Sequence, residues 1–204
     1  FAQVSNPPLD AVREELVTSV AMRLGAQQNL FDESPEHARQ VRISSPVLTN
    51  VDLAKIRAVD APGISSITLS SLFSIESGQG EPGEGAGSGR ALERALDELC
   101  ESASRAISDG HTIIILSDRG VDSSHAAIPS LLAVAGVHHH LIREGTRTQA
   151  ALVVESGEPR EIAHLALLIG YGAGAVNPYV AYETLRSLVA EGTFPAQLRI
   201  SVNG

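Results

Sequence analysis

The sequence has 204 residues, of which 43% are hydrophobic, and a formal net charge of −9. This length supports one domain with a sizeable core, and the acidic balance excludes a nucleic-acid partner, because neutralising phosphates requires a basic face. No apolar run approaches the roughly 20 residues of a membrane helix and no secretory signal is visible, so we expect no membrane partner and a cytoplasmic location. The single cysteine, Cys100, excludes an internal disulfide and fits a reducing compartment. Because the sequence starts at Phe1 rather than Met, we expect a fragment, folded as a single domain over residues 1–204.

The first 50 residues indicate one helix followed by extended chain. Asp10 is a predicted N-cap for a helix over 11–24, and Gly25 is its predicted stop. Apolar residues recur every four positions along it, at Val12, Leu16, Val20 and Leu24. Residues 29–50 are typical of a loop, because prolines interrupt them.

The next segment predicts a short helix, a strand and a flexible loop. The helix is expected over 51–59 and the strand over 64–73, where apolar residues roughly alternate. Residues 77–89 contain six glycines in thirteen positions, so we predict a flexible loop. A phosphate-binding loop is disfavoured there, since the Lys-Ser/Thr pair is missing and Glu81 and Glu84 would repel phosphate.

The remaining residues predict strands that alternate with helices. A helix over 91–109 has one apolar face, and Cys100 beside that face is interpreted as a small buried hydrophobe. Asn177 is a predicted N-cap of the last helix, with Pro178 at its first position. The other elements are expected as strands over 112–117 and 148–155 and helices over 128–143 and 160–169. This order predicts the α/β class with a parallel sheet, arranged as a barrel arc or an open sheet.

Two predicted strands end in charged residues, at the sheet edge where α/β proteins carry their sites. Asp118, Arg119 and Glu155 are therefore candidates for a polar pocket, with the two carboxylates as acid or base. The alternative is turn chemistry, in which Asp118 caps amides and Arg119 pairs with a carboxylate. Without a cofactor motif, we favour the turn chemistry.

Three further patterns carry weaker hypotheses. His138, His139 and His140 cannot close on one metal ion, since successive helical side chains diverge by about 100°. Asp118, His125 and Ser123 or Ser124 have the residue types of a hydrolytic triad, but no nucleophile-elbow glycines flank the serines. Residues 170–174 are rich in glycine without the dinucleotide-binding spacing, and they predict close packing where two helices meet.

Two stretches carry a resemblance to a known family. Residues 116–178, which begin LSDRGVDSSH and end LLIGYGAGAVNP, closely resemble the central domain of the glutamate synthase large subunit. The amino end agrees, with Asn6-Pro7-Pro8-Leu9-Asp10 followed by Arg13-Glu14-Glu15. The resemblance thins over residues 60–90 and after about residue 192. It implies an incomplete TIM-barrel-like arrangement of parallel βα units.

The resemblance also implies a function. Glutamate synthase makes two glutamates from glutamine and 2-oxoglutarate, with a glutamine amidotransferase domain and an FMN-binding synthase domain that bears an iron–sulfur cluster. The central domain would join these two partner domains and help to wall an ammonia tunnel, without catalytic, cofactor or metal residues of its own. Ser5 and Asn6 are the tunnel-lining candidates. The alternative is a stand-alone small-molecule or flavin-binding module that uses the Asp118 and Glu155 edge.

Overall fold

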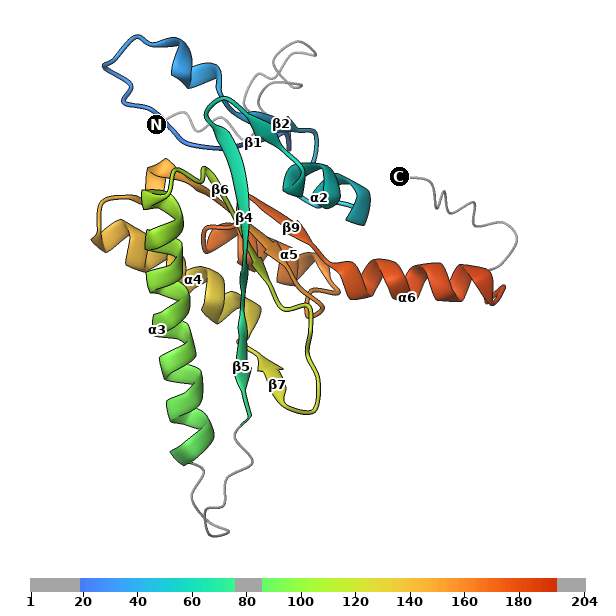
Figure 1. The fold of residues 1–204 in the computed structure, drawn as a ribbon. Coiled ribbons are helices and arrows are strands. Elements are labelled where there is room, and N and C mark those ends of the chain that lie inside the picture. The colour runs from blue at the N-terminus through green and yellow to red at the C-terminus, as the bar shows by residue number, and fades with distance from the viewer. Residues whose placement is uncertain (1–18, 76–85, 194–204) are drawn as a thin grey trace, which may run out of the picture.

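The structure is a computed structural model that describes residues 19–75 and 86–193, with side chains from residue 90 in the second range. At its centre is a five-stranded sheet in the order β3-β4-β6-β8-β9 (Figure 1). Four of these strands run parallel, and only the edge strand β3 is antiparallel to its neighbour. The predicted α/β class is therefore confirmed.

The parallel strands follow the chain in sequence order. β6 and β8 have neighbours on both sides and a helix layer over them, so all of their residues are buried. This explains their unbroken apolar sequences, which are typical of parallel strands covered on both faces. The strands are β3 (Asp60–Ala61), β4 (Ile64–Ser70), β6 (Ile113–Ser117), β8 (Ala151–Glu155) and β9 (Ala175–Asn177).

Three helices cover one face of this sheet, namely α3 (Ala86–Ser108), α4 (Ser130–Arg143) and α5 (Ile162–Gly170). Alternate strand residues point toward them, so Leu116 and Val154 share a core with Val134 of α4. Cys100 of α3 is buried at this core, as the sequence predicted. α3 ends at Ser108, and the chain turns at Gly110, whose φ of +88° suits glycine.

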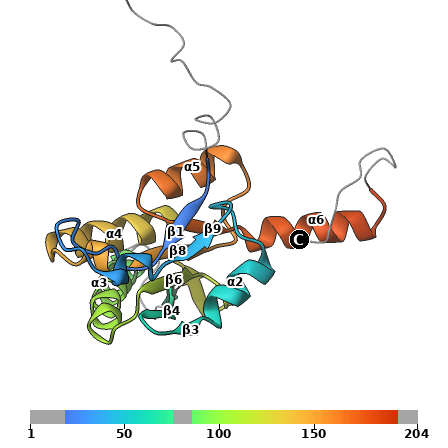
Figure 2. The ribbon, with the colours of Figure 1, turned by 90° about the horizontal axis from the view of Figure 1, so that it is seen from above.

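Amino-terminal elements cover the opposite face (Figure 2). They are a hairpin of β1 (Met22–Leu24) with β2 (Val41–Ile43), and the helix α2 (Asn50–Arg57). Leu24 and Leu53 pack there against Ile115 and Val153 of the sheet. Thr49 caps α2, since its Oγ1 accepts from the Asp52 amide at 3.1 Å. This helix confirms the one predicted over 51–59.

Peripheral elements complete the described chain. β5 (Leu72–Ser74) pairs with β7 (His125–Ala127), and η1 (Pro35–Ala38) and η2 (Arg147–Gln149) are single 3-10 turns. α6 (Tyr179–Ala190) projects away from the body and has no buried residue (Figure 1). Over the described ranges, no helix is long and apolar enough to cross a membrane.

Several predicted boundaries are wrong. Residues 22–24 form a strand rather than the end of a helix, because Leu24 pairs with Val41 and is buried against the sheet. α3 begins at Ala86, so the last residues of the predicted 77–89 loop are helical, and the rest of that loop lies outside the described residues. Most of the predicted 11–24 helix, and Ser5 and Asn6, also lie outside them.

The carboxyl-terminal third differs from the prediction at β9. Residues 170–174 connect α5 to a short strand, and Gly172 packs closely against α4 there, since a Cβ on it would lie 2.3 Å from His138 Nδ1, in line with the predicted close packing. Asn177 is the last residue of that strand, and Pro178 rather than Asn177 is the N-cap of α6. The buried strand β9 is only three residues long, which is too short to show a hydrophobic period, so the sequence pattern did not predict it.

Candidate functional site

The parallel strands end in one row of polar residues. Ser117 is the register partner of Glu155, and Glu155 is the partner of Asn177. The strand that carries Ser70 ends in the same row, opposite Ser117. The row lies at the carboxyl edge of the sheet, where α/β proteins place ligands.

Glu155 is the centre of this edge, with only 1% of its surface exposed. One carboxylate oxygen accepts from Arg119 Nε at 2.6 Å, and the other accepts from Ser117 Oγ at 2.5 Å and from Arg57 Nη2. Burial opposes ionisation, but these hydrogen bonds and the Arg57 charge outweigh it and hold the pKa of Glu155 below its ordinary value. The lowered pKa favours the ionised carboxylate, and both of its oxygens accept hydrogen bonds from groups of this chain.

Asp118 is also buried, and it organises the turn after β8. Its carboxylate accepts from Ser156 Oγ at 2.6 Å and from the Gly157 amide at 3.0 Å. Gly157 allows α6 to approach, since a Cβ there would lie 2.9 Å from Val180 Cγ2. Burial and the nearby Asp118 carboxylate raise the pKa of Tyr179 to about 12.

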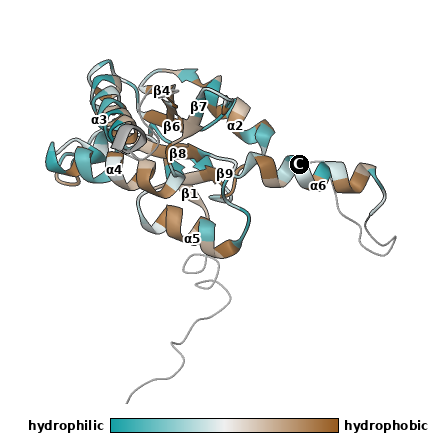
Figure 3. Cartoon of the chain, turned by 90° about the horizontal axis from the view of Figure 1, so that it is seen from below, coloured by the Kyte–Doolittle hydropathy of each residue, from teal (hydrophilic) through white to brown (hydrophobic). Residues whose placement is uncertain are grey.

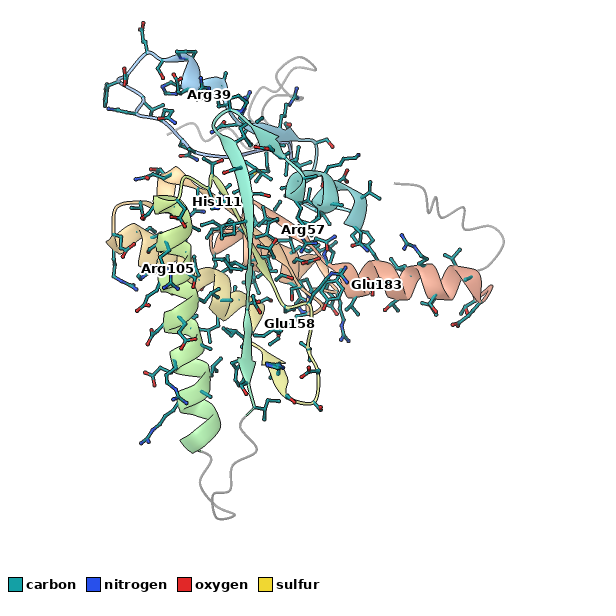
Figure 4. All side chains as sticks on the ribbon, viewed as in Figure 1. Arg39, Arg57, Arg105, His111, Glu158 and Glu183 are labelled. Carbon is teal, nitrogen blue, oxygen red and sulfur yellow. The ribbon has the colours of Figure 1, made fainter. Side chains whose placement is uncertain are left out.

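Arg119 connects the sheet edge to α6. Its guanidinium carbon lies 3.9 Å from the centre of the Tyr179 ring, a cation–π contact, and its Nη atoms donate to Glu183 at 3.3 Å. Arg57 and Glu183 lie on either side of the point where α6 leaves the body (Figure 4). The charged groups thus join α2, β8 and the start of α6.

Asn177 ends the polar row on the other side. Its Nδ2 donates to the Leu48 carbonyl at 2.9 Å and to Asn50 Oδ1 at 3.0 Å. These bonds tie the segment before α2 to the edge strand β9, which the backbone bond from the Leu48 amide to the Val176 carbonyl reinforces. Among the described buried side chains, Asn177 Oδ1 is an acceptor without a partner.

The structure brings together the three residues predicted for this edge, Asp118, Arg119 and Glu155. It also engages each of them in contacts within the protein, in the way that the turn-chemistry interpretation described. A general base needs an accessible lone pair and a pKa near neutrality, and Glu155 has neither. The arrangement is suited to joining elements rather than to transferring protons.

The three consecutive histidines diverge. His138 Nδ1 accepts from Arg147 Nε at 2.8 Å, while His140 Nε2 lies 2.9 Å from Ser104 Oγ of α3. Arg147 also donates to the carbonyls of Ala150 and Gly172, so His138 is held to neighbouring backbone through this arginine. The side chains over the two described ranges contain no group of three or more residues that could hold a metal ion.

The residue types of a hydrolytic triad do not assemble. His125 Nδ1 lies 3.0 Å from Asp122 Oδ1, and Asp122 also accepts from the amides of Ser124 and His125. Asp118 instead bonds Ser156. His125 therefore belongs to a local turn.

Sequence reasoning missed half of the edge. Ser117 ends a predicted strand, and its position opposite Glu155 was a usable signal. No such signal exists for Arg57, Tyr179 and Glu183, because each is far in the sequence from the residue it contacts. Arg57, for example, is 98 positions from Glu155, and Glu183 is 64 positions from Arg119. Such a contact exists only once the sheet has formed.

Comparison with known proteins identifies the family. The model of the glutamate synthase central domain matches residues 1–203. Over 94% of its length, the chain is 42% identical to the glutamate synthase [NADPH] large chain of Bacillus subtilis, of which it covers 12%. Over 96% of its length, it is 39% identical to the ferredoxin-dependent glutamate synthase of Pyropia yezoensis, of which it covers 13%. The chain spans about an eighth of the length of these two relatives, and it belongs to the glutamate synthase central domain family.

Proposed function

We propose that this chain is a linker and scaffold domain of a cytoplasmic glutamate synthase. It would connect the glutamine amidotransferase domain to the FMN-binding synthase domain of the same polypeptide and help to form the ammonia tunnel between them. The observation that carries the proposal is the family match over residues 1–203, together with the small share of the relatives that the chain covers. A segment of this size within a long chain has neighbouring domains.

The state of the polar edge supports a scaffold rather than a catalytic role. Both carboxylate oxygens of Glu155 and of Asp118 accept hydrogen bonds from groups of this chain. FMN and the iron–sulfur cluster would belong to the neighbouring domain, since one cysteine cannot supply the several thiolates of a cluster.

The fold supports a barrel-like arc. β4, β6, β8 and β9 are parallel and adjacent in chain order, and the helices α3, α4 and α5 lie on one face. These three helices are the crossovers that connect the parallel strands, whereas α2 on the other face precedes them in the chain. Sequential strand order with all crossover helices on one face is the arrangement of a (β/α)₈ barrel, whereas a doubly wound sheet has crossover helices on both faces. Only four parallel strands are present in the described ranges, so the domain would be an incomplete barrel.

The start of α6 supports the linker role. Arg119 holds this helix through Tyr179 and Glu183, and Arg119 is itself held by the buried Glu155. The direction in which the chain leaves the body is therefore set by a charged cluster at the sheet edge. A linker needs such a defined exit if two neighbouring sites are to stay aligned.

The tunnel role is tested with the full synthase polypeptide that contains the domain. Ser5→Trp should uncouple the two activities, because a bulky side chain at a tunnel wall obstructs ammonia, so glutamine is hydrolysed with less glutamate formed from 2-oxoglutarate. Ser108→Trp on the exposed end of α3 is the matched control and should leave the ratio unchanged. An unchanged ratio in Ser5→Trp would refute the tunnel role of Ser5, and Asn6→Trp tests its neighbour in the same way.

The scaffold role has a separate test in the isolated chain. Titration of FMN into residues 1–204 should give no saturable change in flavin fluorescence. Saturable binding would instead favour the stand-alone flavin-binding module, with the edge at Asp118 and Glu155 as its site.

A further inference from the structure

A cavity of about 200 Å³ lies at the amino edge of the sheet, at the opposite end of the strands from Glu155. It is found where β1 lies beside α5 (Figure 3). Its walls come from residues 22–27, from η2 with the first residues of β8, and from residues 172–174 before β9. The Gln27 amide donates to the Thr148 carbonyl at 2.7 Å and so joins the first two of these walls. One water molecule needs roughly 10–15 Å³, so a group of several heavy atoms fits.

The described residues that line this cavity carry positive charge and no negative charge. They include Arg23 and Arg147 but no Asp or Glu, although the chain as a whole has a formal net charge of −9. Arg23 is also the register partner of Arg42 in the β1–β2 ladder. Like charges at directly opposite positions of a ladder repel one another. Positive charge is therefore concentrated beside this cavity, in a protein that is acidic overall.

Arg147 is held in a fixed orientation by neutral acceptors. Its Nε donates to His138 Nδ1 at 2.8 Å. Its Nη1 and Nη2 donate to the carbonyls of Ala150 and Gly172, each at 2.8 Å. Because these acceptors come from α4, from the start of β8 and from the turn after α5, the guanidinium is positioned before any ligand arrives.

The hydrogen bonds of Arg147 leave part of its binding capacity unused. A guanidinium has five N–H groups, so one N–H on each Nη remains beyond the bonds described. Burial lowers the pKa of Arg147, and no described carboxylate acts on it in the opposite direction. A partly buried charge is stabilised when an opposite charge pairs with it. Carboxylate and phosphate groups suit this role, because each offers two or more acceptor oxygens to a guanidinium.

We propose that this cavity binds a small oxyanion, with a carboxylate or phosphate group paired to Arg147. The remaining N–H groups on the two Nη atoms would donate to its oxygens, and Arg23 would add attraction from the exposed side. The oxyanion would link β1 to the start of β8 and to the turn after α5. The site is separate from the Glu155 edge and does not depend on the linker role proposed above.

An NMR titration of residues 1–204 tests the site. Sodium phosphate and sodium succinate are the two probes, each added at constant ionic strength with sodium chloride as the balancing salt. The amide signals of Thr148 and Gly172 should shift and saturate with one probe bound per chain. Saturation with phosphate alone would assign the site to phosphate groups, and saturation with succinate alone would assign it to carboxylates.

A matched pair of variants tests the charge of the cavity without altering Arg147. Thr148 is exposed and lines the cavity, and it contacts Gln27 through its backbone. Thr148→Glu should weaken binding at least about tenfold, because its carboxylate repels the anion and competes for the arginines. Thr148→Gln has nearly the same size without the charge and should bind within about twofold of the unaltered chain.

A second pair of variants separates a specific site from general attraction. Arg23→Gln should weaken binding about threefold or more, because it removes one of the two charges that line the cavity. Arg105→Gln on the exposed side of α3 changes the net charge equally and should leave binding unchanged. Shifts that never saturate with either probe would refute the site. Equal binding by the two Thr148 variants, or equal weakening by the two arginine variants, would refute it as well.

Discussion

Replacing Glu155 by glutamine removes the charge at the centre of the sheet edge and keeps the size of the side chain. The variant loses the charge in its hydrogen bonds with Arg57, Arg119 and Ser117. Removing one partner of a fully buried ion pair costs about 3–5 kcal/mol. Here the arginines remain 37% and 40% exposed and keep part of their hydration, so we expect a loss of about 2–3 kcal/mol.

Urea unfolding at pH 7 measures this loss. With a urea dependence of about 2 kcal/mol per M, the midpoint of Glu155→Gln should fall by about 1–1.5 M. Glu183→Gln is the matched control, because Glu183 is 49% exposed and bonds the same Arg119 at 3.3 Å. Its midpoint should shift by less than about 0.5 M, as expected for an exposed pair.

The pH dependence follows from the sign of the shift. The pKa of Glu155 is lower in the folded state than its ordinary value, so its contribution is complete above the unfolded pKa of about 4.3. The stabilisation by the ionised Glu155 is lost as the pH falls through its folded-state pKa, because the carboxylate is then protonated in the folded protein as well. The stability difference between wild type and Glu155→Gln should therefore shrink as the pH falls below about 4.3. Equal midpoints for Glu155→Gln and Glu183→Gln at pH 7 would refute the reasoning.

Two further predictions concern the corner after α5. Gly172→Ala should cost about 2 kcal/mol or more in thermal or urea unfolding, because φ is +115° and the new Cβ would lie 2.3 Å from its nearest neighbour, His138 Nδ1 in the present structure. Gly145→Ala has a φ of +74° and no heavy atom within 4 Å, so it isolates the backbone penalty of about 1 kcal/mol; equal losses would contradict the predicted clash. His138 should titrate below 6.5 in an NMR experiment, because burial, then the charge of Arg147, lowers its pKa. A midpoint at or above 6.5 would contradict the buried position of His138 beside Arg147.

The central elements were predictable because their signals are local. The apolar sequences of β6 and β8 indicated buried parallel strands, and the stripe along α3 indicated a covered helix. The observed ends of these elements differ from the predicted ends by a few residues, since helix and strand ends depend on caps and pairing partners. The alternation of strand and helix was sufficient to predict the α/β class and the edge where Asp118 and Glu155 meet.

Elements with short sequences were decided by tertiary pairing. Residues 22–24 continue a helical stripe, yet they form β1 because pairing with β2 and burial of Leu24 outweigh local preference. β9 has three residues, too few to show a period, and it is defined by its bonds to β8 and to the segment before α2. A hydrophobic period can be recognised only over several residues, and these strands are too short to show one.

The sequence by itself determined the class of fold, the alternation of its central strands and helices, and the resemblance to one family, because each of these depends on residues that are neighbours in the chain. Tertiary structure alone decided what the candidate edge residues do. The partners of Glu155 come from positions 57, 117 and 119, and those of Asp118 come from 156 and 157. Whether a carboxylate acts as a base or as a structural link depends on the groups that surround it. Groups from distant segments of the chain surround it only once the sheet has formed.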